Sequence, residues 1–383
     1  MVWFSGVLLV LTILGAGYYI ASTACLFASF RGKSQAESPD FQPVVSILKP
    51  ACGVDRQAEA NFASYLKQDY PDYEVIFGTL EATDPAIDVI LDTMKGHKHA
   101  SLRIGSTISG ANNKVRILHQ LAKHARGEII VITDADTRVE PNFLRAMVAP
   151  FQDSRVGMVT CLYKGVEATG LADSLEALYM SSIFACGVAC AQQIGGLRFG
   201  LGAAIALRAE VLNAIGGFKP LADYLADDYQ IGHRTALLGW KIELSRYVID
   251  EVMSGESLRS VLSRELRWSR TTRVCRPLGH FGLIFTFGSV YALLLAAIWR
   301  SFSALSILII VLVLRTVCAW LCARKLGDEE FPRRMHLLAL RDVVSFFVWA
   351  AGYLGSTVKW RGRKLRLRKD GRMVRVSQYQ KRG

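Results

Sequence analysis

The sequence predicts an α/β protein with a largely parallel sheet and apolar helices that cross a membrane at both ends of the chain. Three observations predict this class. Short apolar strands alternate with helical segments between residues 44 and 133, the order that produces a parallel sheet with right-handed crossovers. Residues 4–30 contain no charged side chain. Further long apolar stretches follow residue 280 of the 383-residue chain.

The N-terminal apolar stretch is predicted to be an uncleaved membrane anchor, residues 1–30. It is 27 residues long, from Phe4 to Phe30, and about 20 apolar residues suffice to cross a bilayer. A cleavable signal peptide fits poorly, because no basic residue precedes the stretch and Arg31 and Lys33 follow it. That basic flank predicts a cytoplasmic location for the domain that follows.

The next part of the chain is predicted to form the α/β core. Apolar strands are expected at 44–48, 73–79, 101–104 and 128–133, and helices at 56–67, 85–95 and 113–125, the last with Gly127 as its C-cap. In parallel sheets, ligands bind beyond the carboxyl ends of the strands. The residues that follow each strand are therefore the candidates for function.

Carboxylates and lysines follow these strands. Asp134 and Asp136 come directly after the apolar strand EIIVIT, and a divalent cation that bridges to a diphosphate needs such hard oxygen ligands. A solvated turn or a helix cap is the alternative for this pair. The other strand ends carry Lys49, then Glu81 and Asp84, and Lys114 at the start of a helix. Lys114 is expected to contact phosphate or a base carbonyl, with a solvated helix start as its alternative.

Two later motifs extend this chemistry. Asp227 and Asp228 lead into a helix, where they either supply a general base or satisfy the preference for acids at a helix N-terminus. Arg264, Arg267 and Trp268 form an RxxRW motif on a predicted helix. Arginines three apart share a helix face, and their planar forks bind a diphosphate bidentately. A plain amphipathic interface helix is the alternative for this motif.

Three apolar segments near the C-terminus are predicted to be membrane segments. Phe281–Trp299 and Ser301–Ala323 suggest a hairpin that turns at Arg300, whereas Val343–Val358 has only 16 residues and is re-entrant, interfacial or part of a longer span. A further uncharged run, 177–197, lies in the chain between Asp134 and Asp136, which we call the DxD pair, and Asp228. Because these acids must meet in one site, we expect that run to be an interfacial helix that does not cross, followed by a core strand at 200–207.

The positive charge is concentrated at the C-terminus. The chain has 46 basic and 33 acidic residues, a net charge of +13. Residues 359–383 alone contain 11 basic residues and one acidic residue, a net charge of +10, which leaves the rest of the chain at +3. A basic tail beside a membrane segment predicts contact with anionic lipid head groups on the cytoplasmic side. Its few aromatics and its position argue against nucleic-acid binding.

Together the motifs resemble those of glycosyltransferase family 21, the ceramide glucosyltransferases, over roughly residues 40–360. The matching segments are VSILKPACGVD (45–55), QDYPDYEVIFG (68–78), DPAID (84–88), ADDYQIGHR (226–234) and RELRW (264–268). The motif sequences are most similar to those of bacterial members, which include hopanoid-biosynthesis enzymes. The resemblance implies a GT-A nucleotide-sugar-binding domain at 31–276, C-terminal membrane segments at 277–358, and a multi-pass protein of the cell inner membrane.

The resemblance also implies roles for the site residues. Glu81, where most members have Asp, would contact the uridine of a UDP-sugar. Asp84 would share this contact. Asp134 would contact the donor and Asp136 would bind Mg²⁺ or Mn²⁺. Asp228 would be the base that activates a hydroxyl of a membrane lipid acceptor, with inversion at the sugar carbon.

Three other functions remain open from the sequence. The first is transfer of N-acetylglucosamine to a hopanoid polyol. The second is a polyprenyl-phosphate sugar transferase, and the third is an inactive membrane scaffold. The RxxRW motif followed directly by membrane segments argues against the polyprenyl-phosphate transferase, and the otherwise intact acids and arginines argue against the scaffold.

Overall fold

The computed structural model describes residues 2–31, 41–360 and 363–375. They form two compact units. The sheet unit comprises Gly32–Lys164, Gly195–Ser254 and Arg372–Gly383, and the helical unit comprises Met1–Arg31, Gly165–Ile194 and Gly255–Gly371. The segments 165–194 and 255–276, which the sequence assigns to the catalytic domain, are thus part of the helical unit.

The sheet unit is built on eight strands in the order β3-β2-β1-β4-β7-β6-β8-β5. Every strand expected from the alternating pattern is present within two residues of its predicted position. The strands are β1 (Val45–Pro50), β2 (Tyr73–Thr79), β3 (Ala100–Ile104), β4 (Ile129–Thr133), β5 (Thr137–Arg138), β6 (Val156–Val166), β7 (Ala204–Arg208) and β8 (Lys241–Val252).

The sheet is mixed rather than parallel throughout. Strands β1, β2, β3 and β4 pair in parallel, as the sequence predicts. Strand β7 is the expected core strand, but it runs antiparallel to β4 and to β6. Strand β5 also pairs antiparallel with β8. An antiparallel extension of a parallel sheet is common in large α/β proteins, and it brings the loop before β7 to the carboxyl end of β4.

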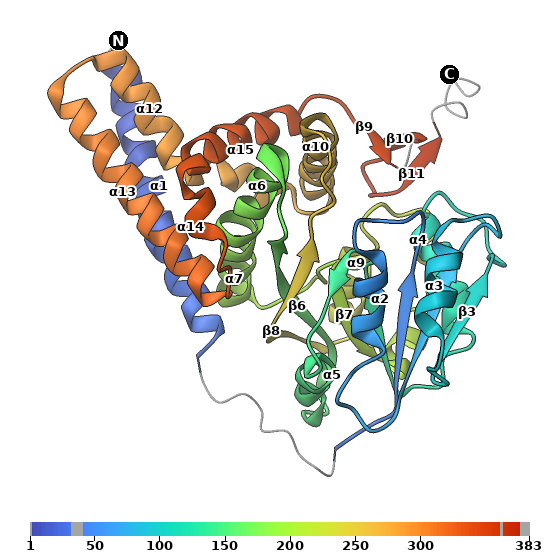
Figure 1. The fold of residues 1–383 in the computed structure, drawn as a ribbon. Helices are drawn as coiled ribbons and strands as arrows, with labels where there is room; N and C mark the ends of the chain where they lie inside the picture. The colour runs from blue at the N-terminus through green and yellow to red at the C-terminus, as the bar shows by residue number, and fades with distance from the viewer. Residues whose placement is uncertain (1, 32–40, 361–362, 376–383) are drawn as a thin grey trace. The chain divides into compact units, whose positions relative to one another are not determined.

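Helices cover this sheet (Figure 1), and the apolar core lies between the helices and the sheet. They are α2 (Ala58–Tyr65), α3 (Ala86–Met94), α4 (Asn113–Ala122), α5 (Phe143–Val148), α8 (Ala209–Ala214) and α9 (Asp227–Leu237), with 3₁₀ turns at Ala149–Gln152 and Lys219–Leu221. The prediction that Gly127 caps α4 is wrong, because the helix ends at Ala122. Gly127 is needed for space instead: an added Cβ would lie 2.4 Å from the Ser46 nitrogen.

The helical unit contains the apolar segments. Its helices are α1 (Val2–Ser29), α6 (Gly170–Tyr179), α7 (Ala185–Gly195), α10 (Leu258–Cys275), α11 (Pro277–Gly282), α12 (Gly288–Trp299), α13 (Phe302–Lys325), α14 (Phe331–Arg334) and α15 (Leu338–Gly352). A π-helical turn, Met180–Phe184, joins α6 to α7, and 3₁₀ turns lie at Leu283–Thr286 and Met335–Leu337. The short strands β9 (Thr357–Trp360) and β10 (Arg363–Leu367) follow α15, and β11 (Met373–Arg375) belongs to the sheet unit.

Within the described residues, four helical stretches are long and apolar enough to cross a membrane. They are Trp3–Ser29, Gly170–Gly195, Phe302–Lys325 and Phe331–Gly352, and the bent pair Pro277–Thr286 and Gly288–Trp299 forms a possible fifth. Helices α12 and α13 turn at Arg300, as predicted, where Arg300 has a φ of 46°. The third predicted C-terminal segment differs from Val343–Val358, because α15 ends at Gly352 and a strand follows.

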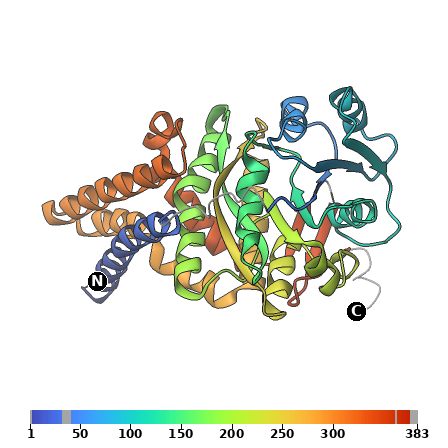
Figure 2. The same cartoon turned by 90° about the horizontal axis from the view of Figure 1, so that it is seen from below.

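Helices α1, α12 and α13 lie side by side (Figures 1 and 2). The closest approach is between α1 and α12, where a Cβ on Gly15 would lie 2.4 Å from the Gly288 backbone. Small residues at such crossings allow membrane helices to pack backbone against backbone. A side chain at Gly15 would therefore separate the two helices.

Candidate functional site

The turn after β4 carries the DxD pair and is supported from below by Lys49. The Lys49 ammonium donates to the Asp134 carbonyl oxygen at 2.6 Å and lies 3.7 Å from the centre of the Tyr65 ring. Lys49 is 0% exposed, and burial lowers the pKa of its ammonium to about 7 against the attraction of Asp136 and Asp134. Lys49 therefore lies beneath the turn that the sequence predicts to bind substrate.

Lys114, at the start of α4, faces the first acid of the pair. Its ammonium is 2.6 Å from an Asp134 carboxylate oxygen and 3.9 Å from one of Asp227. Burial favours the neutral form of Lys114, but Asp134 and Asp227 outweigh it and raise the pKa of Lys114 above its usual range. Lys114 is thus a fixed cation between two acidic segments.

Asn112 fixes the start of α4 against the start of α9. Its side-chain oxygen caps α4 by accepting from the Val115 nitrogen at 3.1 Å. Its side-chain nitrogen donates to the Tyr224 carbonyl at 2.9 Å and to the Asp227 carboxylate at 3.2 Å. This fully buried residue links the segments that position Lys114 and Asp228.

Gly202, in the loop before β7, marks where two predicted site acids converge. A Cβ added to Gly202 would lie 3.2 Å from an Asp228 carboxylate oxygen and 3.6 Å from one of Asp134. The loop is held by the Gly200 nitrogen, which donates to the Asp228 carbonyl at 3.2 Å, and by the Asp134 nitrogen, which donates to the Ala203 carbonyl at 3.3 Å. Only a residue without a side chain leaves open the space between these carboxylates.

Asp136 and Asp228 have strongly raised pKa values. Burial, with the neighbouring carboxylates of Asp134 and Asp55, raises the pKa of Asp136 to about 7. Burial and the adjacent Asp227 raise the pKa of Asp228 to about 6, although Lys114 opposes the shift. Both side chains keep some exposed surface. Accessible groups with perturbed pKa values are typical of catalytic and binding sites.

The residues present fit a divalent cation at Asp136. Among the described side chains, no cationic group lies within ion-pair distance of the Asp136 carboxylate, whereas Asp134 is paired with Lys114. No cluster of three or more His, Cys, Asp or Glu side chains suited to a metal is found in the described part of the chain. One or two carboxylates completed by substrate phosphates are the usual protein contribution to a Mg²⁺ site.

Glu81 and Asp84 follow β2 but differ in their surroundings. Glu81 is exposed at the strand end. The Asp84 carboxylate already accepts from the Gly53 nitrogen at 2.8 Å and from the Ala86 nitrogen at 3.0 Å, so it joins the loop after β1 to the start of α3. Of the two, Glu81 is the side chain left available to a ligand.

Asp55 is an acid that the sequence argument missed as a site residue. It follows β1. Its carboxylate contributes to the raised pKa of Asp136 and partly opposes the lowering of the Lys49 pKa by burial. Its position was within the segment VSILKPACGVD, and its place after a parallel strand was the signal that could have identified it.

The RxxRW residues lie on α10 in the helical unit. Arg264 donates to both carboxylate oxygens of Glu176 on α6, at 2.8 and 2.6 Å. The Trp268 ring stacks on the Tyr179 ring, with centroids 6.3 Å apart and planes at 18°. The Arg267 guanidinium lies 5.6 Å from the centre of the Trp360 ring. Each motif residue is therefore engaged by a neighbour within this unit.

A second ion pair holds α10 through the residue after Arg264. Arg341 of α15 donates to both carboxylate oxygens of Glu265, at 2.6 and 2.9 Å, and to the Ser345 hydroxyl at 3.0 Å. Arg341 and Glu265 are both buried. Arg341 also lies over the Tyr179 ring, with 5.4 Å to its centre. This support could not be predicted from the sequence, because the partners are far apart along the chain.

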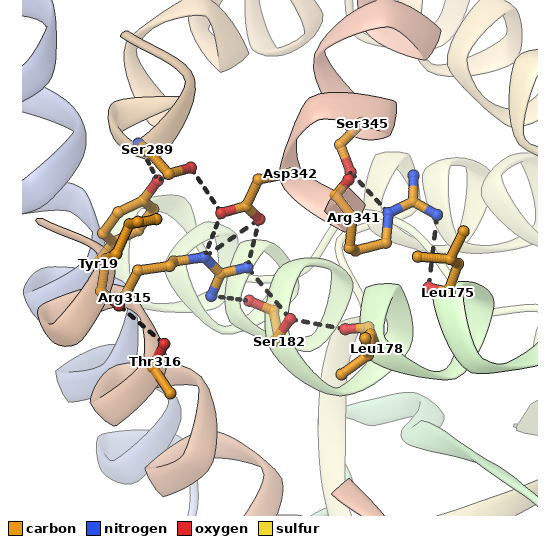
Figure 3. A network of polar contacts seen from close by, with 11 residues as sticks. Tyr19, Leu175, Leu178, Ser182, Ser289, Arg315, Thr316, Arg341, Asp342 and Ser345 are labelled. Atoms are coloured by element: carbon orange, nitrogen blue, oxygen red, sulfur yellow. Dashed lines mark hydrogen bonds and ion pairs between the residues drawn. The ribbon is translucent and has the colours of Figure 1, made fainter. Parts of the chain in front are cut away.

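A buried polar network joins the membrane-type helices (Figure 3). Arg315 of α13 donates to both carboxylate oxygens of Asp342, at 3.0 and 2.9 Å, and to the Ser182 hydroxyl at 3.2 Å. The Ser289 hydroxyl donates to Asp342 at 2.6 Å, and the Tyr19 hydroxyl donates to Ser289 at 3.1 Å. Each charged side chain in this network makes at least two hydrogen bonds.

Comparisons with known proteins identify the family of the chain. The sequence model of glycosyl transferase family 21 matches residues 7–373. Ceramide glucosyltransferase 3 of Caenorhabditis elegans is 23% identical over 370 residues, which cover 93% of this chain and 80% of that protein. Ceramide glucosyltransferase 1 of the same organism is 22% identical over 388 residues, which cover 95% and 80%.

A solved structure shows the same fold. The mannosyltransferase PcManGT from Pyrobaculum calidifontis, in complex with GDP-Man and Mn²⁺, matches 91% of this chain and 99% of its own, with a TM-score of 0.57 and 17% sequence identity. The predicted combination of a glycosyltransferase α/β domain with apolar N- and C-terminal helices is thus confirmed. Because the family model covers nearly the whole sequence, the chain belongs to glycosyl transferase family 21.

Proposed function

We propose that the protein transfers a hexose from a UDP-sugar to a hydroxyl of a membrane lipid, with ceramide as the acceptor and inversion at the sugar carbon. The observation that carries this proposal is the convergence of Asp134 and Asp228 at Gly202, beside the cation Lys114. The relatives named ceramide glucosyltransferase support the acceptor and the sugar.

In this mechanism Asp228 is the catalytic base. Its carboxylate removes the proton of the acceptor hydroxyl, the hydroxyl oxygen forms a bond to C1 of the sugar, and the bond from C1 to the UDP oxygen breaks. A carboxylate with a pKa of about 6 is a better proton acceptor than an ordinary aspartate and is still ionised at neutral pH. General base catalysis of this kind contributes about 10²–10⁴-fold.

The other residues bind and orient the donor. Asp136 and the donor diphosphate would hold Mg²⁺ or Mn²⁺, which when bound would supply positive charge to the leaving group. The solved relative with GDP-Man and Mn²⁺ supports a divalent ion in this fold. Lys114 fixes Asp134 beside the donor, Lys49 supports the turn, and Glu81 contacts the uridine. Arg264, Arg267 and Trp268 are assigned to the diphosphate and acceptor by the family motif.

The membrane arrangement follows from chain connectivity. The chain leaves the sheet unit after residue 164 and returns at 195. The single helical stretch 170–195 therefore lies along the membrane surface and does not cross the membrane. The Met373 nitrogen donates to the Asp223 carbonyl at 2.7 Å, which supports a tail on the same side of the membrane as the sheet unit. This placement requires an even number of crossings between residues 254 and 372, and we assign the crossing pair to α12 and α13, which are joined by the tight turn at Arg300.

On this arrangement α14 and α15 do not cross, and α1 is the N-terminal anchor. The basic residues after α1 and after α15 favour the cytoplasmic face of a cell inner membrane for the sheet unit. Protease cleavage of the tail in sealed inside-out vesicles, with the tail protected in right-side-out vesicles, is the expected result. Protection in inside-out vesicles would contradict the arrangement.

The acceptor and the sugar are tested by product analysis. Lipids from cells that express the protein, supplied with ceramide and hopanoid polyols together, are expected to contain a new hexosylceramide by mass spectrometry. The Asp228→Asn variant at equal expression should give none. A hopanoid that carries N-acetylglucosamine, or a polyprenyl-phosphate sugar, would instead identify one of the alternative transferases, and absence of any lipid product would overturn the function.

A further inference from the structure

The segment after α15 forms a two-faced basic hairpin. We define the basic hairpin as β9 with β10, which pair antiparallel with Lys359 opposite Lys364 and Val358 opposite Leu365. Val358 and Leu365 are buried, whereas Lys359 and Lys364 are exposed. Arg366 is also exposed and shares the lysine face by its register. The hairpin therefore has one buried apolar face and one exposed cationic face.

The two lysines lie opposite each other without a counter-charge from the described part of the chain. Neither ammonium is within ion-pair distance of a carboxylate among the residues that the structure describes. Like charges directly opposite on a strand pair destabilise the pair. An anionic partner from outside the described chain would convert this unfavourable pair into a favourable one.

The residues just before the hairpin indicate the kind of partner. Tyr353 and Leu354, directly after α15, are 41% and 71% exposed, and they follow a stretch that is apolar enough to enter a membrane. An aromatic ring and an aliphatic side chain next to a row of cations match the boundary between acyl chains and head groups. A folded acidic protein or a nucleic acid would not require this exposed apolar pair.

Three arginines of α10 contact the hairpin and the residues just before it. Arg270 donates to the Thr357 carbonyl and, at 2.6 Å, to the Leu354 carbonyl. Arg273 donates to the Gly355 carbonyl at 3.1 Å, and Arg267 lies over the Trp360 ring. These arginines are three residues apart and share one helix face. A change in the hairpin is therefore passed directly to the helix that carries the RxxRW motif.

We propose that the basic hairpin docks on anionic phospholipid head groups and that docking fixes Arg267 of α10, so that anionic lipid activates the enzyme. The activity part rests on the proposed transferase function, whereas the docking part does not. Lys359 and Lys364 form the docking surface, and Trp360 with the α10 arginines connects it to the motif. Neutral lipid leaves the lysine pair unfavourable and the hairpin loosely held.

The docking is tested by amide hydrogen exchange of the full chain in nanodiscs, a measurement that needs no turnover. We compare discs of phosphatidylcholine alone with discs that contain 30% phosphatidylglycerol. Residues 357–367 of the wild type should exchange at least about fivefold more slowly in the anionic discs, because each basic side chain near an anionic surface favours binding about fivefold. Equal exchange in both discs would overturn the proposal.

A variant and a control isolate the lysine pair. Lys359→Gln with Lys364→Gln should remove the lipid-dependent protection and the lipid-dependent increase in UDP release, so that the exchange and the rate become the same in neutral and anionic discs. The control, Lys67→Gln with Lys98→Gln, removes the same charge from exposed positions of the sheet unit and should behave like the wild type. Equal loss in the control would contradict docking at the hairpin.

A soluble anion distinguishes a lipid surface from a phosphate site. Glycerol 3-phosphate added to neutral discs, at the total concentration of phosphatidylglycerol used above, should give no protection of residues 357–367. The same protection from soluble phosphate would overturn membrane docking. If protection occurs with anionic lipid but UDP release is undetectable in all discs, the docking stands and the proposed transferase function fails.

Discussion

Two clusters of charged side chains in this molecule differ in how completely their charges are compensated. In the sheet unit, Asp134, Asp136 and Asp228 keep some exposed surface, and of the three only Asp134 forms an ion pair with a described side chain, Lys114. In the helical unit, Arg315 with Asp342 and Arg341 with Glu265 form bidentate pairs that are almost entirely buried.

From this difference we infer that the first cluster is functional and the second structural. Burial, together with the excess negative charge in the sheet unit, raises the pKa values of Asp136 and Asp228, and the excess negative charge favours binding of a cation. The buried pairs of the helical unit have no capacity left for a ligand. Buried pairs often add little net stability, but loss of one partner leaves a charge uncompensated. Mutations in the two clusters should therefore fail in different ways.

The largest expected effect on turnover comes from the metal position. Asp136→Ala should lower the rate of UDP release by about 10³-fold, because a bound metal supplies several kcal/mol of transition-state stabilisation. A chelator should reduce the wild-type rate to a similar extent, and added Mn²⁺ should restore the wild type only. Asp92→Asn, at an exposed carboxylate paired with Lys95, is the control and should keep full activity. Wild-type activity in excess EDTA would contradict the metal assignment.

The buried pair at α10 sharpens the other side of the comparison. Arg341→Met should destabilise the helical unit by about 3–5 kcal/mol, because Glu265 would be left charged and unpaired. Arg341→Met combined with Glu265→Leu should be less destabilised than Arg341→Met alone, since no charge is then stranded. Thermal unfolding in detergent measures both. A double variant less stable than the single one would contradict this account of the pair.

The pH dependence tests the raised pKa of Asp228. At saturating Mn²⁺, the rate constant kcat/KM should fall about tenfold per pH unit below a midpoint near 6, because protonated Asp228 is too weak a base to remove the acceptor proton. Above that midpoint Asp228 is ionised and the rate should level off. A midpoint near the ordinary value for aspartate, about 4, would show that burial and Asp227 do not act on the base as described.

The smallest effects are expected at the end of β2. Glu81→Gln should raise KM for the donor about five- to tenfold with little change in kcat, as expected for loss of one charged hydrogen bond made equally in ground and transition states. Asp84→Asn should lower stability rather than affinity, because Asp84 holds the Gly53 and Ala86 nitrogens. The reverse pattern would assign the uridine contact to Asp84.

Much of the sheet unit could be predicted because its information is local. Apolar strands such as EIIVIT and the helices between them identify β1 to β4, and their ends identify Asp134, Asp136 and Lys114. Asp228 was also identified from its adjacent acids. The direction of β7 was not predictable, because an apolar run carries no record of strand direction. The convergence at Gly202 depends on that direction.

The supports of the site were not predictable because they are long-range. Lys49 looks like a solvent-facing lysine at a strand end, and only the packing of Tyr65 and the Asp134 carbonyl around it reveals that it is buried. Arg341 and Glu265 are 76 residues apart, and nothing local marks them as partners. Asp55 follows a strand like the other acids, but no second acid or helix start drew attention to it.

The central claim is that the exposed, undercompensated cluster performs catalysis, whereas the buried, compensated cluster maintains the fold. The most direct test measures turnover per folded molecule and thermal unfolding for Asp228→Asn and Asp342→Asn in parallel. Asp228→Asn should lose about 10²–10⁴-fold in kcat with donor binding and unfolding temperature unchanged. Asp342→Asn should unfold at a lower temperature while its folded fraction keeps near wild-type turnover. Full activity in Asp228→Asn would contradict the account.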